Sequence, residues 1–174
     1  WLLIAILAVA NFRRIGTVEL PSTSGLAAAR ARRFKHIVIV PCYLDPVNIL
    51  FEALGSLALQ EDTSDLFVVV TFEATTPELG SKLEAVRAAF DQTRFGDFVA
   101  LSHSVIEGRE IPGGCSNKNF ALRTAWKLLT TKYPGADAMA VTCTTCDTDS
   151  LFHPCYFRVL QDAYNARNTV LGAA

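Results

Sequence analysis

The sequence predicts an α/β fold in which helices flank a mostly parallel β-sheet. Short apolar runs rich in β-branched residues, of the kind found in buried parallel strands, recur along the chain. Segments with apolar residues at helical spacing separate these runs, and this alternation indicates an α/β architecture. Hydrophobic residues make up 51% of the 174 residues, which is enough for a core and excludes a disordered chain.

The predicted elements follow in order from the apolar runs and from the residues that begin or end helices. Asp45 and Pro46 indicate a helix start, because Asp suits the N-cap and Pro suits the first turn. Thr76 and Pro77 give a similar signal for the next helix. The predicted strands are 36–40, 66–70, 98–101 and 138–142, and the predicted helices are 45–57, 76–90 and 116–133.

Charge and cysteine content narrow the class of protein further. The formal net charge is -1, and a nucleic-acid-binding protein needs a basic surface, so we expect no nucleic acid partner. The chain has 5 cysteines at irregular spacing, which does not fit a disulfide framework in a chain with this much core. We therefore expect reduced thiols, as on the cytosolic side of a membrane.

The first residues predict attachment to a membrane. Trp1–Ala10 are uniformly apolar and Arg13 and Arg14 follow, although a complete span needs about 20 residues. We interpret 1–12 as the end of a truncated transmembrane segment whose basic flank marks the cytosolic side. A buried helix or strand, or the remnant of a signal peptide, is the alternative. Residues 13–35 are then a juxtamembrane linker, and the domain after it is predicted on the cytosolic side.

Two acidic residues, Asp147 and Asp149, follow the last predicted strand and flank a single residue. Mg²⁺ and Mn²⁺ bind carboxylate oxygens and commonly keep water and phosphate oxygens as further ligands. Paired acids in loops are often only solvated turn residues. Their position beyond a strand end of an α/β sheet, where such sheets bind ligands, favours a Mg²⁺ or Mn²⁺ site.

Three ordered segments resemble family 2 glycosyltransferases. Residues 147–157, Asp-Thr-Asp-Ser-Leu-Phe-His-Pro-Cys-Tyr-Phe, are similar to that family's Asp-x-Asp segment, closest to the membrane-integrated group related to cellulose and hyaluronan synthases. Residues 37–43, Ile-Val-Ile-Val-Pro-Cys-Tyr, resemble its first strand and Pro-x-Tyr turn, and Asp45 stands where the family has an acidic residue. Matching segments in the right order are more specific than any of them alone.

The third segment, residues 110–122, resembles the stretch Gly-Lys-x-x-Asn-x-Asn-x-Ala-Leu, which opens a helix beside the sugar donor. Gly114 stands where the family has lysine. Lys118 lies one helical turn further on and can supply the missing charge at a helix N-terminus, which favours phosphate. In the alternative interpretation Lys118 is solvated, and Asn117 and Asn119 only cap the helix.

The resemblance implies a GT-A nucleotide-diphospho-sugar transferase fold, with residues 36–174 forming the N-terminal part of a glycosyltransferase 2-like catalytic domain. It implies a metal-dependent hexosyltransferase that moves a sugar from a nucleotide-diphosphate donor, a UDP-sugar by preference, to a hydroxyl of a glycan or another acceptor. Polysaccharide synthesis is one such reaction. The catalytic base of this family is expected beyond residue 174.

The resemblance also implies a set of site residues. Glu73 follows the second strand, where an acid accepts hydrogen bonds from the base, although a solvated loop acid is the alternative. Asp147 and Asp149 would hold the metal, with Asp147 also near the ribose or sugar. The residues expected to bind the nucleotide sugar are Pro41, Tyr43, Asp45, Glu73, Asn117, Lys118 and Asp147.

Other classes of function remain as alternatives. A non-catalytic GT-A-like nucleotide-binding module is one, because the lysine is missing at Gly114. A Rossmann-like nucleotide-binding domain is another, but its Gly-rich turn is absent from residues 41–45. A zinc site at Cys143, Cys146, His153 and Cys155 is disfavoured, since residues three apart in a strand point to opposite faces. His103 is expected to be structural.

Overall fold

The computed structural model describes residues 35–91 and 94–171, which belong to a unit spanning Arg32–Ala174. The predicted membrane segment 1–12, and the linker up to residue 34, lie outside the described residues. Within the described ranges, no helix has both the length and the apolar character needed to cross a membrane.

The described chain forms a four-stranded parallel sheet in the order β3-β2-β1-β4. β1 lies at its centre, where Val38 pairs with Val68 of β2 on one side and Thr144 of β4 on the other. The strands are β1 (Lys35–Cys42), β2 (Leu66–Glu73), β3 (Asp97–His103) and β4 (Val141–Thr145). The predicted α/β fold with a parallel sheet is confirmed.

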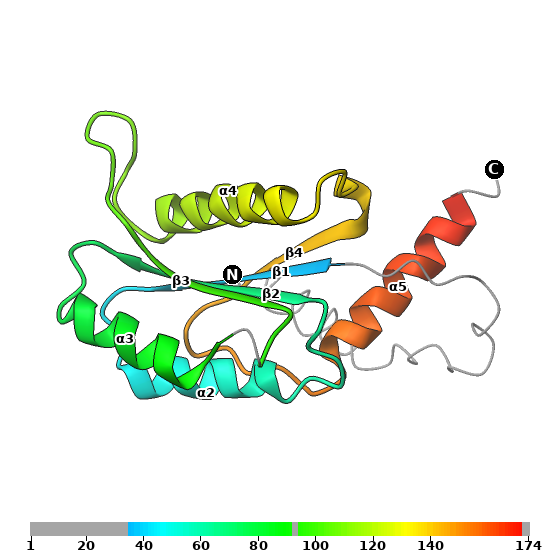
Figure 1. Ribbon diagram of the computed structural model, residues 1–174, viewed down its shortest axis with the longest axis horizontal. Helices are drawn as coiled ribbons and strands as arrows, with labels where there is room; N and C mark the ends of the chain where they lie inside the picture. The colour runs from blue at the N-terminus through cyan, green and yellow to red at the C-terminus, as the bar shows by residue number, and fades with distance from the viewer. Residues whose placement is uncertain (1–34, 92–93, 172–174) are drawn as a thin grey trace, which may run out of the picture. The chain divides into compact units, whose positions relative to one another are not determined.

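Helices cover both faces of this sheet (Figure 1). α4 packs on one face, whereas α2 and α3 lie on the other. α5 follows β4, and its first turn joins the α2 side of the core through Phe157. The helices are α2 (Val47–Ala58), α3 (Leu79–Ala89), α4 (Gly114–Lys132) and α5 (Tyr156–Leu171).

The alternation of side chains along β1 explains why its sequence is apolar without interruption. Val38 and Val40 point into the cluster that α2 completes, while Ile37 and Ile39 point into the cluster that α4 completes. All four are buried, with exposed fractions of 1% or less. A strand covered on both faces needs apolar residues at every position, as the sequence predicted.

The last strand differs from the prediction in position and in burial. It covers 141–145 rather than 138–142, because the Asp137 carboxylate accepts a hydrogen bond from the Met139 backbone at 2.8 Å and stabilises a 3-10 turn at Ala138–Ala140. β4 is also an edge strand whose side chains are partly exposed, not a buried strand. As a result the strand ends two residues before Asp147.

The starts of two helices also differ from the prediction. Pro46, not Asp45, is the N-cap of α2, because the Asp45 carboxylate accepts a hydrogen bond from the Tyr43 backbone instead. α3 begins at Leu79 rather than near Thr76, after Glu78 adopts a left-handed conformation with φ 55°. In both cases local hydrogen bonding or turn geometry displaces the helix start that the sequence indicated.

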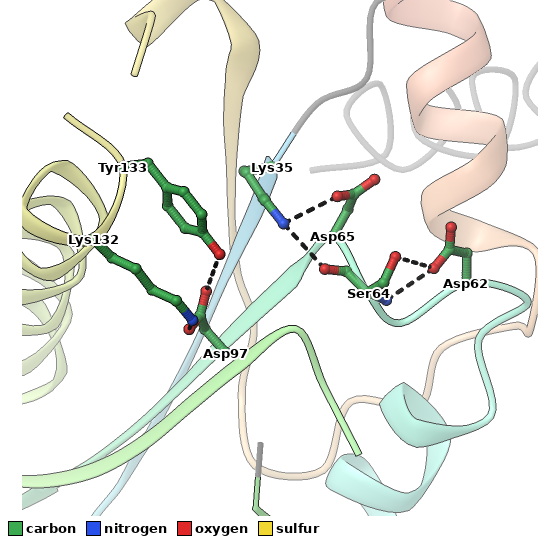
Figure 2. Close-up of polar contacts among 7 residues, drawn as sticks. All are labelled: Lys35, Asp62, Ser64, Asp65, Asp97, Lys132 and Tyr133. Carbon is green, nitrogen blue, oxygen red and sulfur yellow. Dashed lines mark hydrogen bonds and ion pairs between the residues drawn. The ribbon is translucent and has the colours of Figure 1, made fainter. Parts of the chain in front are cut away.

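Ion pairs join the amino ends of β1 and β3 to neighbouring segments of the chain (Figure 2). Lys35, the first residue of β1, contacts the Asp65 carboxylate at 3.1 Å and the Ser64 carbonyl at 3.1 Å. Lys132, in the last turn of α4, pairs with Asp97 at the start of β3, and this contact raises the pKa of the lysine. The C-terminal end of α4 is thereby held at the amino ends of the strands, whereas its N-terminal end lies at their carboxyl ends.

Gly96 precedes β3 at a point where the backbone of another segment passes close by. Its N–H donates to the Thr63 carbonyl at 2.9 Å. A Cβ atom at this position would lie 2.0 Å from the carbonyl oxygen of Ser64, which is a backbone atom and cannot rotate away. This position therefore requires glycine.

We predict that Gly96→Ala lowers the free energy of unfolding by at least 1–3 kcal/mol, about the cost of overpacking. The measurement is the midpoint of urea unfolding. Gly55→Ala is the matched control, because Gly55 lies within α2 and has open space around it. That change should stabilise the protein by roughly 0.5–1 kcal/mol. Equal midpoints for Gly96→Ala and the wild type would show that the close approach does not exist.

Candidate functional site

A cleft of about 500 Å³ lies at the carboxyl ends of the strands. Its walls are formed by the end of β1 and the residues after it, the end of β2, the start of α4 with the residues before it, and the residues after β4. β1 lies between β2 and β4, and the connecting helices cover opposite faces of the sheet. Open α/β sheets bind ligands where the strand order reverses in this way, outside the carboxyl ends.

The structure brings the predicted nucleotide-sugar residues together in this cleft. Asp149, which was predicted as a metal ligand, is exposed and is not among the residues that line the cleft. The prediction missed several lining residues that adjoin the predicted ones in sequence. The lining residues are Pro41, Cys42, Tyr43, Asp45, Glu73, Pro112, Gly113, Gly114, Asn117, Lys118, Asp147 and Thr148.

The wall after β1 presents an aromatic ring and a carboxylate. Tyr43 is 40% exposed, and its backbone N–H donates to Asp45 Oδ2 at 3.4 Å. Lys82 of α3 donates to the Asp45 carbonyl at 3.4 Å. Beside them, burial raises the pKa of the Cys42 thiol to about 11, and Asp45 adds to this effect, so the thiol is neutral near pH 7. This wall suits a flat ring and a hydrogen-bond donor.

Glu73 is the last residue of β2 and forms the cleft wall beside the β1 loop. It is 8% exposed, so it is not the solvated loop acid of the alternative interpretation. Its backbone carbonyl accepts a hydrogen bond from the Thr76 backbone at 2.9 Å, which closes a turn directly after β2. A buried carboxylate in a cleft wall favours a ligand that donates N–H or O–H groups.

The side chain of Asn117 is used inside the protein. It is 1% exposed, its Oδ1 accepts from the Thr71 hydroxyl at 2.7 Å, and its Nδ2 donates to the Thr71 carbonyl at 3.0 Å. This pair joins the first turn of α4 to β2. Asn117 is therefore a positioning residue, and it does not cap the helix as the alternative interpretation had it. The N-cap is Gly113, whose φ of 131° favours glycine.

Lys118 and Asp147 form an ion pair in the cleft. Lys118 Nζ lies 3.2 Å from Asp147 Oδ1, and their side chains are 32% and 77% exposed. Asp147 is held by a turn in which its N–H donates to the Ser150 hydroxyl at 3.1 Å. Gly114 lies in the same cleft and supplies no charge. Lys118 thus places a positive charge in the cleft, in contact with Asp147.

The carboxylates of this region allow only partial coordination of a metal by the protein. Within the part of the chain that the structure describes, no group of three or more His, Cys, Asp or Glu side chains is placed to hold a metal ion. Mg²⁺ is commonly bound by one or two carboxylates together with substrate phosphates and water. Asp147 fits that donor set, and Asp149 lies two residues further along the same loop.

Cys146 lies between the strand and this loop. Its Sγ faces the Ile39 carbonyl at 3.6 Å. Burial raises the pKa of its thiol to about 12, with Asp147 adding to the effect and Lys118 opposing it. A thiol with such a pKa is protonated at neutral pH.

A buried histidine organises the loop that leads into α4. His103 is 3% exposed, its Nε2 lies 3.1 Å from Glu110 Oε2, and its ring stacks on Phe120 at 4.5 Å. Glu110 also accepts from the Ile106 backbone at 2.9 Å, and this bond, aided by His103, lowers the pKa of Glu110. His103 does not line the cleft.

Comparisons with known proteins agree with this architecture at the level of fold. No family model and no curated protein matches the chain. Among solved structures, the mannosyltransferase PcManGT from Pyrobaculum calidifontis, in complex with GDP-Man and Mn²⁺, has 22% sequence identity and a TM-score of 0.50. The alignment covers 76% of this chain and 32% of that one.

The fold is that of a GT-A glycosyltransferase. A structure of S. aureus TarS is similar at 22% identity, with 75% of this chain and 31% of that chain covered and a TM-score of 0.46. Its complex with UDP-GlcNAc has a TM-score of 0.43 and covers 75% of this chain and 30% of that chain, again at 22% identity. The chain spans about a third of the length of these neighbours.

We predict that Asn117→Ala lowers the free energy of unfolding by roughly 1–3 kcal/mol, because the buried hydroxyl and carbonyl of Thr71 lose their partner. Asn119→Ala is the control, since Asn119 is exposed on the same helix and its loss should change stability by less than about 0.5 kcal/mol. Chemical denaturation measures both. If the two variants were equally stable, the Thr71–Asn117 pair would not position α4.

Proposed function

We propose that this protein binds a nucleotide-diphosphate sugar, by preference a UDP-sugar, and acts as a hexosyltransferase that moves the sugar to a hydroxyl of a glycan or a similar acceptor. The observation that carries the proposal is the cleft itself. Residues 41–45, Glu73, residues 112–118 and Asp147 are far apart in sequence and meet at the strand ends of a GT-A fold. These are the segments whose residues resemble family 2 glycosyltransferases.

The cleft divides into a region for the base and a region for the diphosphate. Tyr43, Asp45 and Glu73 lie in the walls after β1 and β2, where an aromatic ring and carboxylates suit a base and a ribose. Lys118 and Asp147 lie with the first turn of α4, where backbone N–H groups and the helix dipole favour phosphate. In this arrangement the donor lies across the carboxyl end of β1.

In the proposed reaction, Lys118 and the N–H groups of α4 balance the negative charge that develops on the diphosphate leaving group. Asp147 and Asp149 would hold Mg²⁺ or Mn²⁺, which supplies Lewis-acid stabilisation of the same group. Asn117 keeps the helix end in place through Thr71. We assign no residue of the cleft as the catalytic base.

A second candidate is a binding module that holds the donor without transferring its sugar. Gly114 favours this candidate, because the residue at this point of the cleft carries no charge. Donor hydrolysis and sugar transfer by the protein distinguish the two: turnover supports the transferase, and binding without turnover supports the module.

We further propose a membrane-attached protein with this domain on the cytosolic side. Release of the protein into the soluble fraction on carbonate extraction would argue against attachment.

We predict that Mn²⁺ strengthens the binding of UDP and that Asp147→Asn or Asp149→Ala removes this enhancement. Calorimetric titration of UDP with Mn²⁺, and again with chelator, measures it. Glu84→Gln is the control, because Glu84 is an exposed acid of α3 outside the cleft. If affinity is the same with Mn²⁺ and with chelator, the metal has no role in donor binding. If only Asp149→Ala has no effect, Asp147 alone holds the metal.

We predict that Lys118→Met weakens UDP binding roughly ten- to a hundredfold, the effect of losing one charge-assisted contact. Adding Gly114→Lys to this variant should restore part of the affinity, because it returns a cation to the cleft. Titration of UDP in the presence of Mn²⁺ measures both. An unchanged affinity for Lys118→Met would show that Lys118 makes no phosphate contact and would favour the binding module.

A further inference from the structure

The described residues that line the cleft include more acidic than basic side chains. Asp45, Glu73 and Asp147 are acidic, and Lys118 is the basic residue among the described residues that line it. Its ammonium group lies 3.2 Å from Asp147 Oδ1. The carboxylate that is best placed to meet a metal ion is therefore already paired with a cation of the protein.

The ion pair between Lys118 and Asp147 can separate at little cost in free energy. The Asp147 side chain is 77% exposed and the Lys118 side chain is 32% exposed, so the contact is in water and weak. Lys118 extends from the helix end that faces the cleft, and Asp147 follows β4 in a hydrogen-bonded turn. A flexible lysine can leave for a nearby anion, whereas the carboxylate stays in its turn.

We propose that Lys118 competes with the divalent cation for Asp147, so that the cation binds more tightly once the diphosphate of the donor has drawn Lys118 away. This inference rests on the proposed function and adds the coupling between its two ligands. Donor and metal then bind cooperatively, and by linkage each strengthens the other by the same factor. Lys118 is the element that couples them.

The competition predicts an effect of Lys118 on the metal in the absence of any nucleotide. Removing the lysine frees Asp147, so Lys118→Met should bind Mn²⁺ alone about two- to fivefold more tightly than the wild type, the range expected for an exposed ion pair. The same substitution is expected to weaken UDP binding. Opposite signs for the two ligands are the signature of competition, because general damage to the cleft weakens both.

The test is a titration of the protein with Mn²⁺ alone. The electron paramagnetic resonance signal of the free ion reports how much Mn²⁺ remains unbound. Lys127→Met is the matched control, since Lys127 is an exposed lysine of α4 outside the cleft. It should leave Mn²⁺ affinity unchanged. Circular dichroism confirms that each variant is folded, and Lys118→Gln provides a second neutral side chain at the same position.

A double-mutant cycle locates the competition. In an Asp147→Asn background, Lys118→Met should give no gain in Mn²⁺ affinity, because the shared carboxylate is gone. The proposal is overturned if Lys118→Met and Lys118→Gln leave Mn²⁺ affinity unchanged, if they bind no Mn²⁺, or if the gain persists in the Asp147→Asn background. UDP binding is measured separately. Loss of the competition with UDP binding intact refutes only this inference, whereas absence of UDP binding refutes the proposed function.

Discussion

The parallel pairing of β1 with β2 on one side and β4 on the other is the constraint on which the remaining structure depends. It places β1 in the interior of the sheet, where helices cover both of its faces, and it directs the carboxyl ends of the three strands to the same edge of the sheet. The residues that follow these strands therefore meet, although long stretches of chain separate them. The position of the cleft is a consequence of this pairing.

α4 completes the site because it is held at both ends. Asn117 joins its first turn to Thr71 of β2, and Lys132 joins its last turn to Asp97 of β3. Between these contacts, Ala121 and Ala125 let the helix approach the sheet closely. The N-terminus of the helix is thereby fixed beside the cleft, and Lys118 with it.

Much of this fold could be predicted from the sequence, because the apolar runs and helical spacings report burial directly. The residues at which the strands and helices begin and end could not be predicted in this way. The shift of β4 depends on the hydrogen bond from Met139 to Asp137, and the start of α2 depends on the use of the Asp45 side chain by Tyr43. The sequence shows that these polar side chains are present, but several backbone partners compete for each of them.

The residues that line the cleft were predictable for a different reason: the sequence around them resembles a known family. That resemblance brought the lining residues to attention, but it did not distinguish a ligand contact from a positioning contact. Asn117 looks in sequence like a residue facing the donor, yet its amide is turned to Thr71. The pairing of Lys118 with Asp147 links residues far apart in sequence, so no local pattern indicates it.

The walls of the cleft come from segments that assemble only when β1, β2, α4 and β4 are all in place. A molecule that fits there consequently recognises the folded chain and has no site on the unfolded one. At a concentration 100 times its Kd, such a molecule adds about 2.7 kcal/mol to the stability of the folded state. The melting temperature of this protein should therefore follow the supply of its ligand, and the abundance of the folded chain in a cell should follow it as well.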